Sequence, residues 1–99
     1  MRALLKSALA LIAIGALVLP VSAGTLEDVK SRGELRCVVS TGIAGFAYPD
    51  ESGTWKGFDI DFCRATAAAV LGSSSKIKAV TSTGKTRFTK LNSGEGDVL

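Results

Sequence analysis

After residue 24, some segments have apolar residues at helical spacing and others have short runs of apolar and β-branched residues. The first pattern predicts helices and the second predicts strands. Helical spacing of apolar residues predicts a helix over residues 57–72, ended by Gly72. The apolar positions of this stripe are Ile60, Cys63, Ala67, Val70 and Leu71. Two shorter helices are expected over residues 25–32 and 85–93, because each has an apolar edge and is followed by a glycine.

Three stretches rich in apolar and β-branched residues predict strands. They cover residues 35–39, 77–80 and 97–99, and the last is the beginning of a strand. Residues 42–57 are expected to form a loop, since they contain the turn dipeptides PD and SG. Strands that alternate with helices predict an α/β fold with a parallel sheet.

Two features predict how the helices begin. Thr25 is expected to cap the first helix, with Asp28 three residues on as in a capping box. Asp59 and Asp61 are two residues apart, so on a helix they point to nearly opposite sides. They are therefore expected in the first turn, near the positive end of the helix dipole, and not as a catalytic carboxylate pair.

The first 23 residues have the pattern of a secretory signal peptide. Arg2 and Lys6 precede an unbroken apolar run over residues 8–19, and small residues follow it. The run is shorter than the ~20 residues that a membrane span requires. We therefore expect cleavage after Ala23 and an exported mature chain, residues 24–99, that is not embedded in the membrane.

The charge balance changes this picture little. The chain has 12 Lys and Arg residues against 9 Asp and Glu residues, and two of the basic residues lie in the predicted signal peptide. The remainder has no basic run interleaved with aromatic residues. No nucleic-acid partner is expected.

The only two cysteines are Cys37 and Cys63, in a chain expected to reach an oxidising compartment. Cys63 lies on the apolar stripe of the long helix, and Cys37 alternates with Leu35 and Val39 on one strand face. A disulfide is favoured. A cysteine nucleophile would lack a histidine to activate it, and two cysteines are too few for a metal site. No catalytic residue, metal or cofactor is expected.

The stretch "AVTSTGKT" is close to a phosphate-binding loop and lies between a predicted strand and a predicted helix. Its first position is Ala79 instead of glycine, which weakens the match. A polar turn is favoured, in which Thr83 caps the helix that follows.

Three stretches carry a resemblance to a known family: "RGELRC", "GFDIDFCRA" and "RFTKLNSGEGDVL". They resemble the N-terminal part of periplasmic solute-binding proteins of amino-acid ABC transporters (family 3), most closely the general L-amino-acid-binding branch. The resemblance implies a type II periplasmic-binding-protein fold, in which two α/β lobes close on an amino acid. It also implies that the compartment of the mature chain is the periplasm, with a transporter permease in the inner membrane as partner and no enzymatic activity. Residues 24–99 would be a partial first lobe.

The resemblance further implies which residues touch the ligand. In related binders the ligand lies against the loops that follow the first two strands, here residues 40–46 and 83–85. The implied substrate-binding residues are Ser40, Thr41, Phe46, Thr83 and Gly84. Relatives specific for basic amino acids carry an acid at the position of Ser40 and a stacking aromatic at that of Ile43, so a basic ligand is not expected. The arginine that grips the ligand carboxylate would lie beyond Leu99.

Two residues depart from the family pattern. Thr66 stands where an aliphatic residue is usual and is expected to bond back to the preceding turn. Gly96 stands where Val or Ile is usual. Together with the end of the chain at "GDVL", they suggest a truncated copy that is not competent alone. The alternatives are a secreted dehydratase-type enzyme on the same fold, or a small secreted disulfide-bonded domain without a small-molecule ligand.

Overall fold

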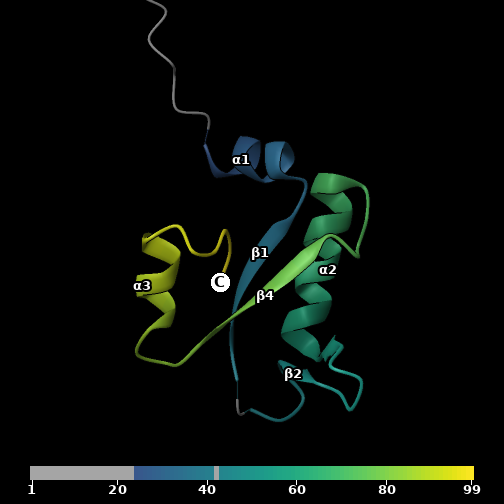
Figure 1. Cartoon of the computed structure of the whole chain (residues 1–99), viewed down its shortest axis with the longest axis vertical. Helices are drawn as coiled ribbons and strands as arrows, with labels where there is room; N and C mark the ends of the chain where they lie inside the picture. The colour runs from purple at the N-terminus through teal and green to yellow at the C-terminus, as the bar shows by residue number, and fades with distance from the viewer. Residues whose placement is uncertain (1–23, 42) are drawn as a thin grey trace, which may run out of the picture.

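The structure is a computed structural model that describes residues 24–41 and 43–99 (Figure 1). The predicted signal peptide therefore lies outside the described residues. The elements, in chain order, are α1 (Thr25–Arg32), β1 (Leu35–Ser40), β2 (Tyr48–Pro49), β3 (Trp55–Lys56), α2 (Phe58–Leu71), β4 (Ile77–Ser82) and α3 (Arg87–Asn92).

The main sheet is parallel, as predicted. Strand β1 pairs with β4 in a register that runs from Leu35 opposite Ile77 to Ser40 opposite Ser82. On the other edge of β1, Val98 forms a parallel bridge, and its carbonyl accepts the Val38 N–H at 2.8 Å. The predicted third strand is thus present as a single bridge, and β1 is the central strand.

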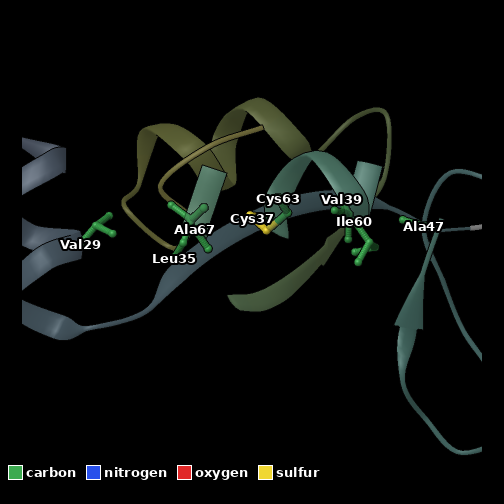
Figure 2. Close-up of a cluster of buried hydrophobic side chains, with 8 residues drawn as sticks. All are labelled: Val29, Leu35, Cys37, Val39, Ala47, Ile60, Cys63 and Ala67. Carbon is green, nitrogen blue, oxygen red and sulfur yellow. A yellow bond between two sulfur atoms is a disulfide. The ribbon is translucent and has the colours of Figure 1, made fainter. Parts of the chain in front are cut away.

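The core lies between β1 and α2. Strand β1 buries alternate residues toward the helix, and α2 buries the stripe that its spacing predicts. The buried cluster is made of Val29, Leu35, Cys37, Val39, Ala47, Ile60, Cys63 and Ala67. Figure 2 shows these side chains in a row along β1, with the disulfide bond near the middle. Val70 and Leu71 are partly buried against the cluster.

The opposite face of β1 holds Val38, which is 3% exposed. Helix α3 lies on the side of the strand pair away from α2 in the view of Figure 1. Gly96 lies against Val38, and a Cβ atom added at Gly96 would overlap Cγ2 of the valine. Gly96, which departs from the family pattern, therefore provides the space that the Val38 side chain fills.

One carboxylate joins three parts of the chain. Asp97, whose side chain is 4% exposed, accepts the Arg36 N–H at 2.8 Å and the Arg36 guanidinium at 3.2 Å. It also pairs with the Arg32 guanidinium. Burial raises the pKa of Asp97, but these donors outweigh burial and hold that pKa below its ordinary value. The ion pairs join α1, β1 and the segment that contains Val98.

Helix α1 begins differently from the prediction. Gly24 is the N-cap residue, and its carbonyl accepts the N–H groups of Glu27 and Asp28 at 3.0 and 3.2 Å. The predicted Thr25 cap is wrong, because Thr25 already has helical geometry and Gly24 has the extended conformation that a cap requires. Gly33 ends the helix in the left-handed conformation, as predicted.

The Thr83 cap is also wrong. Helix α3 is shorter than predicted, and its N-cap residue is Thr86. The Thr83 carbonyl accepts the N–H groups of Thr86 and Arg87 at 3.2 and 3.1 Å, and its hydroxyl accepts the Lys85 N–H at 3.3 Å. Thr83 thus closes a tight turn before α3, which agrees with the predicted polar turn.

The loop predicted between β1 and α2 contains a small hairpin of β2 and β3. Asp50 organises its turn by accepting the N–H groups of Ser52 and Thr54 at 2.9 and 3.0 Å, and it pairs with Lys56 at 3.1 Å. The Ser52 hydroxyl, the Lys56 ammonium and the Thr54 N–H hold the pKa of Asp50 well below its usual range. The PD and SG signals mark this turn correctly, but the two-residue strands were not predicted.

Candidate functional site

The two loops implied by the resemblance lie at one edge of the sheet. Ser40 and Ser82 are the last residues of β1 and β4 and are opposite each other in the register. Thr41 and Thr83, which follow them, are both exposed. The carboxyl ends of parallel strands are where open α/β sheets bind ligands. The structure therefore brings the predicted loops together at the edge where a ligand would lie.

An open groove of about 600 Å³ lies at this edge and beside β1. Its walls come from β1, the loop after β1, one face of α2, the start of α3 and the end of the chain. The lining residues are Cys37, Val38, Val39, Ser40, Ile43, Phe46, Asp59, Phe62, Cys63, Thr66, Arg87, Val98 and Leu99. Of the predicted site residues, Ser40 and Phe46 line the groove. Thr41, Thr83 and Gly84 do not, although they belong to the same two loops.

Two charged side chains line the groove, Asp59 and Arg87. Asp59 is in the first turn of α2, and Arg87 is the first residue of α3, directly after the turn that follows β4. Among the described residues Arg87 has no carboxylate partner. Its guanidinium carbon lies 5.0 Å from the centre of the Phe88 ring. Sequence reasoning missed Arg87 as a site residue, although its place just after a strand and turn was a usable signal.

The start of α2 holds the first loop in place. The N–H groups of Phe58 and Asp59 donate to the carbonyls of Gly45 and Phe46, each at 2.9 Å. Gly57 has φ 118°, and a Cβ atom added there would overlap the Phe46 carbonyl. The loop between β1 and β2 can lie this close to the helix only because residue 57 is a glycine.

Aromatic side chains continue from this loop along α2. The ring centres of Phe46 and Phe58 are 6.1 Å apart, and those of Phe58 and Phe62 are 4.9 Å apart. All three side chains remain exposed, at 45%, 59% and 62%. Phe46 and Phe62 line the groove, whereas Phe58 lies between them without lining it, and the two rings make this side of the groove apolar.

The predicted roles of the aspartates and of Thr66 agree with the structure. Asp59 and Asp61 both lie in the first turn of α2, and Asp61 pairs with Arg64 at 3.7 Å. The Thr66 hydroxyl donates to the Phe62 carbonyl one turn back at 2.9 Å. Within residues 24–41 and 43–99, no group of three or more His, Cys, Asp or Glu side chains could hold a metal ion. None of the helices in that part of the chain is long and apolar enough to cross a membrane.

Comparison with known proteins gives a consistent result. The family profile of the bacterial extracellular solute-binding proteins, family 3, matches residues 35–99. The general L-amino acid-binding periplasmic protein of Rhizobium johnstonii is 53% identical over 96% of this chain. The glutamate/glutamine/aspartate/asparagine-binding protein of Rhodobacter capsulatus is 55% identical over 89% of the chain. The chain spans 29% of the length of the first relative and 26% of the second.

Solved structures show the same fold. A periplasmic binding protein from Brucella ovis with glutathione bound has a TM-score of 0.71 and 51% identity, and the match covers 75% of this chain and 23% of that one. An ancestral cyclohexadienyl dehydratase has a TM-score of 0.65 and 30% identity, with 77% of this chain and 30% of that one covered. The expected fold class is confirmed: the described residues have the α/β fold of part of one lobe of a type II periplasmic binding protein.

Proposed function

Because the chain belongs to the bacterial extracellular solute-binding proteins of family 3, we propose that it contributes part of the ligand site of a periplasmic amino-acid-binding protein. Residues 24–99 form part of the first lobe. Residues 1–23 act as a signal peptide that is cleaved after Ala23. The bound amino acid is passed to the permease of an ABC transporter in the inner membrane, and the chain itself catalyses no reaction.

The observation that carries this proposal is the charged groove at the carboxyl edge of β1 and β4. A free amino acid has one carboxylate and one ammonium group, and both lose water when the molecule is bound. Its carboxylate needs charge-assisted donors, for which an arginine is well suited. Arg87 is the one cationic side chain that lines the groove, and Asp59 is the one anionic side chain. Thus the groove carries both charges that a zwitterion requires.

The loop residues indicate a class of ligand. Ser40 and Ile43 offer neither an acid nor an aromatic ring to a basic side chain. Where the arginine implied beyond Leu99 holds the carboxylate that all amino acids share, Arg87, which has no ion-pair partner in the described part of the chain, is available for an additional carboxylate or amide oxygen of the ligand. The two relatives support an acidic amino acid or its amide as ligand, because one is named as a general L-amino-acid-binding protein and the other as binding glutamate, glutamine, aspartate and asparagine.

Nuclear magnetic resonance of the ¹⁵N-labelled chain, residues 24–99, tests the proposal. Titration with L-glutamate or L-glutamine is expected to shift the amide signals of Ser40, Thr41 and Gly84 in a saturable manner. Arg87→Ala should abolish these shifts. Lys78→Ala, which removes an exposed cation from β4 away from the groove, should leave them unchanged.

Two comparisons separate recognition from a non-specific charge effect. D-glutamate carries the same charges as L-glutamate, so it should shift the three signals much less if the groove reads the shape of the ligand. Shifts of equal size for both enantiomers, or shifts spread over the whole chain, would contradict the proposed site.

A further inference from the structure

Ser82 is a buried polar residue, with 5% of its surface exposed. Its hydroxyl donates to the Val39 carbonyl at 3.0 Å. Ser82 is the last residue of β4, and Val39 is the last but one of β1. The bond therefore crosses between the two strands at the point where both of them end.

The other hydroxyl-to-carbonyl bonds within residues 24–41 and 43–99 are local. The Thr66 hydroxyl donates to Phe62 within α2, and the Ser93 hydroxyl donates to Lys90 at the end of α3. The Ser82 bond instead joins residues 43 positions apart. A buried hydroxyl without a partner is costly, so the bond fixes the position of Ser82 relative to Val39.

The two loops of the candidate site begin directly after this bond. Thr41 follows β1 and Thr83 follows β4, so the distance between the loops depends on how the two strand ends are held together. Beyond Ser82 the Thr83–Thr86 turn is held by its own hydrogen bonds. It can therefore move as a unit, with Arg87 behind it, if the end of β4 is released.

We propose that Ser82 is a positioning residue of the ligand site, whose hydroxyl holds the turn after β4 and Arg87 in register with the loop after β1. This inference rests on the proposed function for its meaning as a ligand site. Whether the Ser82 hydroxyl holds the two strand ends together does not depend on a ligand, and amide hydrogen exchange measures it without one.

Three variants of the chain test the proposal. Ser82→Ala removes the hydroxyl and leaves the Val39 carbonyl buried without this donor. Ser82→Thr keeps the hydroxyl and should restore the bond. Ser93→Ala removes a hydroxyl-to-carbonyl bond at the other end of α3 and is the matched control. Thermal unfolding of all three shows whether each variant folds.

The first measurement is amide hydrogen exchange without ligand. In Ser82→Ala, exchange at Val39, which pairs with Thr81 next to the end of the two strands, should rise about five-fold, as expected for the loss of one buried hydrogen bond of about 1 kcal/mol. Exchange at Thr83 and Arg87, whose N–H groups donate within the turn, should not change, because the turn moves as a unit.

Gly33 lies just before β1, at the end of the strand opposite to Ser40, and its N–H donates to the Val29 carbonyl in α1. Exchange at Gly33 should not change. An equal rise at Gly33 would mean a general loss of stability and would overturn the positioning role, as would unchanged exchange at all sites.

The second measurement is the titration with L-glutamate. In Ser82→Ala, the apparent dissociation constant obtained from the shifts of Thr41 and Gly84 should rise about five-fold. Ser82→Thr should restore the natural value, and Ser93→Ala should leave it unchanged. Failure of Ser82→Thr to recover the shifts would overturn the role of the hydroxyl. If the natural chain shows no shifts, the proposed ligand function fails, while the exchange experiment still decides whether Ser82 positions the loops.

Discussion

Cys63 in α2 is bonded to Cys37 in β1, and the Cα atoms of the two residues lie 6.2 Å apart. The bond joins the central strand to the helix that covers the core, and it closes a loop between residues 26 positions apart. In chain-entropy terms a loop of this length stabilises the fold by about 3.5 kcal/mol. A disulfide contributes substantially to the stability of a small domain, because such a domain buries a smaller fraction of its surface on folding than a large domain does.

Replacement of both cysteines by alanine is expected to lower the free energy of unfolding by about 2–5 kcal/mol. Chemical denaturation of oxidised protein and of the double variant measures the difference. Dithiothreitol should destabilise the natural chain by a similar amount and leave the double variant unaffected. Two free thiols in oxidised protein, found by alkylation and mass spectrometry, would show that the bond does not form.

Gly57→Ala is expected to destabilise the chain more than Gly72→Ala. Both glycines have positive φ angles, 118° and 73°, so alanine is strained at either position. Only at Gly57 would the added Cβ also overlap the Phe46 carbonyl. We expect a loss of about 1 kcal/mol for Gly72→Ala and about 3 kcal/mol for Gly57→Ala. Urea denaturation of the two variants tests the difference, and equal losses would argue against a close approach at residue 57.

The main elements were predictable because burial imposes a period on the sequence. The stripe of α2 and the alternation along β1 are both consequences of one buried face. Cys37 and Cys63 lie on those faces, so their pairing followed from the packing of strand on helix together with the expected compartment. The glycines after α1 and α2 end these helices in the left-handed conformation, as predicted.

The remaining features depend on contacts that a local pattern does not contain. Strands β2 and β3 have two residues each, too few to show a period. Thr83 is a residue type that often caps helices, but its carbonyl accepts the N–H groups of Thr86 and Arg87 in a turn, and α3 therefore begins at Arg87. Arg87 lines the groove because β4 ends beside β1, which is a tertiary relationship. The interior position of Ser82 has the same origin.

Gly96→Val is expected to destabilise the chain through residue 38. The added side chain would overlap Val38, which is buried on the face of β1 away from α2. Overpacking of this kind typically costs about 1–3 kcal/mol. In the double variant Val38→Ala/Gly96→Val, the new side chain has room, so the two changes should be less costly together than their sum. Additive effects in denaturation experiments would mean that the two positions do not compete for space.

Acid is expected to destabilise the fold through Asp97. Its pKa is lowered in the folded state, so it binds a proton less readily there than in the unfolded chain. The stabilisation is complete above the unfolded pKa of ~3.9 and is lost as the pH falls through the lower folded value. Asp97→Asn should destabilise the chain at neutral pH by about 2 kcal/mol, because bonds to the two arginines are weakened.

The pH profile separates this carboxylate from the others. Denaturation midpoints of the natural chain and of Asp97→Asn should begin to converge as the pH falls below ~4, where Asp97 becomes protonated in the unfolded chain. They should meet only below the lower folded pKa, where Asp97 is protonated in both states. Glu51→Gln, a change at an exposed turn position, is the control and should leave the profile unchanged. A constant difference between natural chain and Asp97→Asn down to low pH would show that the charge of Asp97 is not what stabilises the fold.

Binding of a free L-amino acid to residues 24–99 alone is expected to be weaker than micromolar. A ligand in a typical pocket has ~70–90% of its surface buried. The groove beside β1 is open, and the polar residues that line it are Ser40, Asp59, Thr66 and Arg87, all from this one part of the fold. Two-lobed binding proteins enclose the ligand by hinge closure, which supplies the contacts on the other side. Isothermal titration with a panel of L-amino acids should therefore give no saturable heat at micromolar concentrations, while resonance shifts at Thr41 and Gly84 appear at millimolar ligand. Saturable micromolar binding would show instead that this part of the first lobe makes the site by itself.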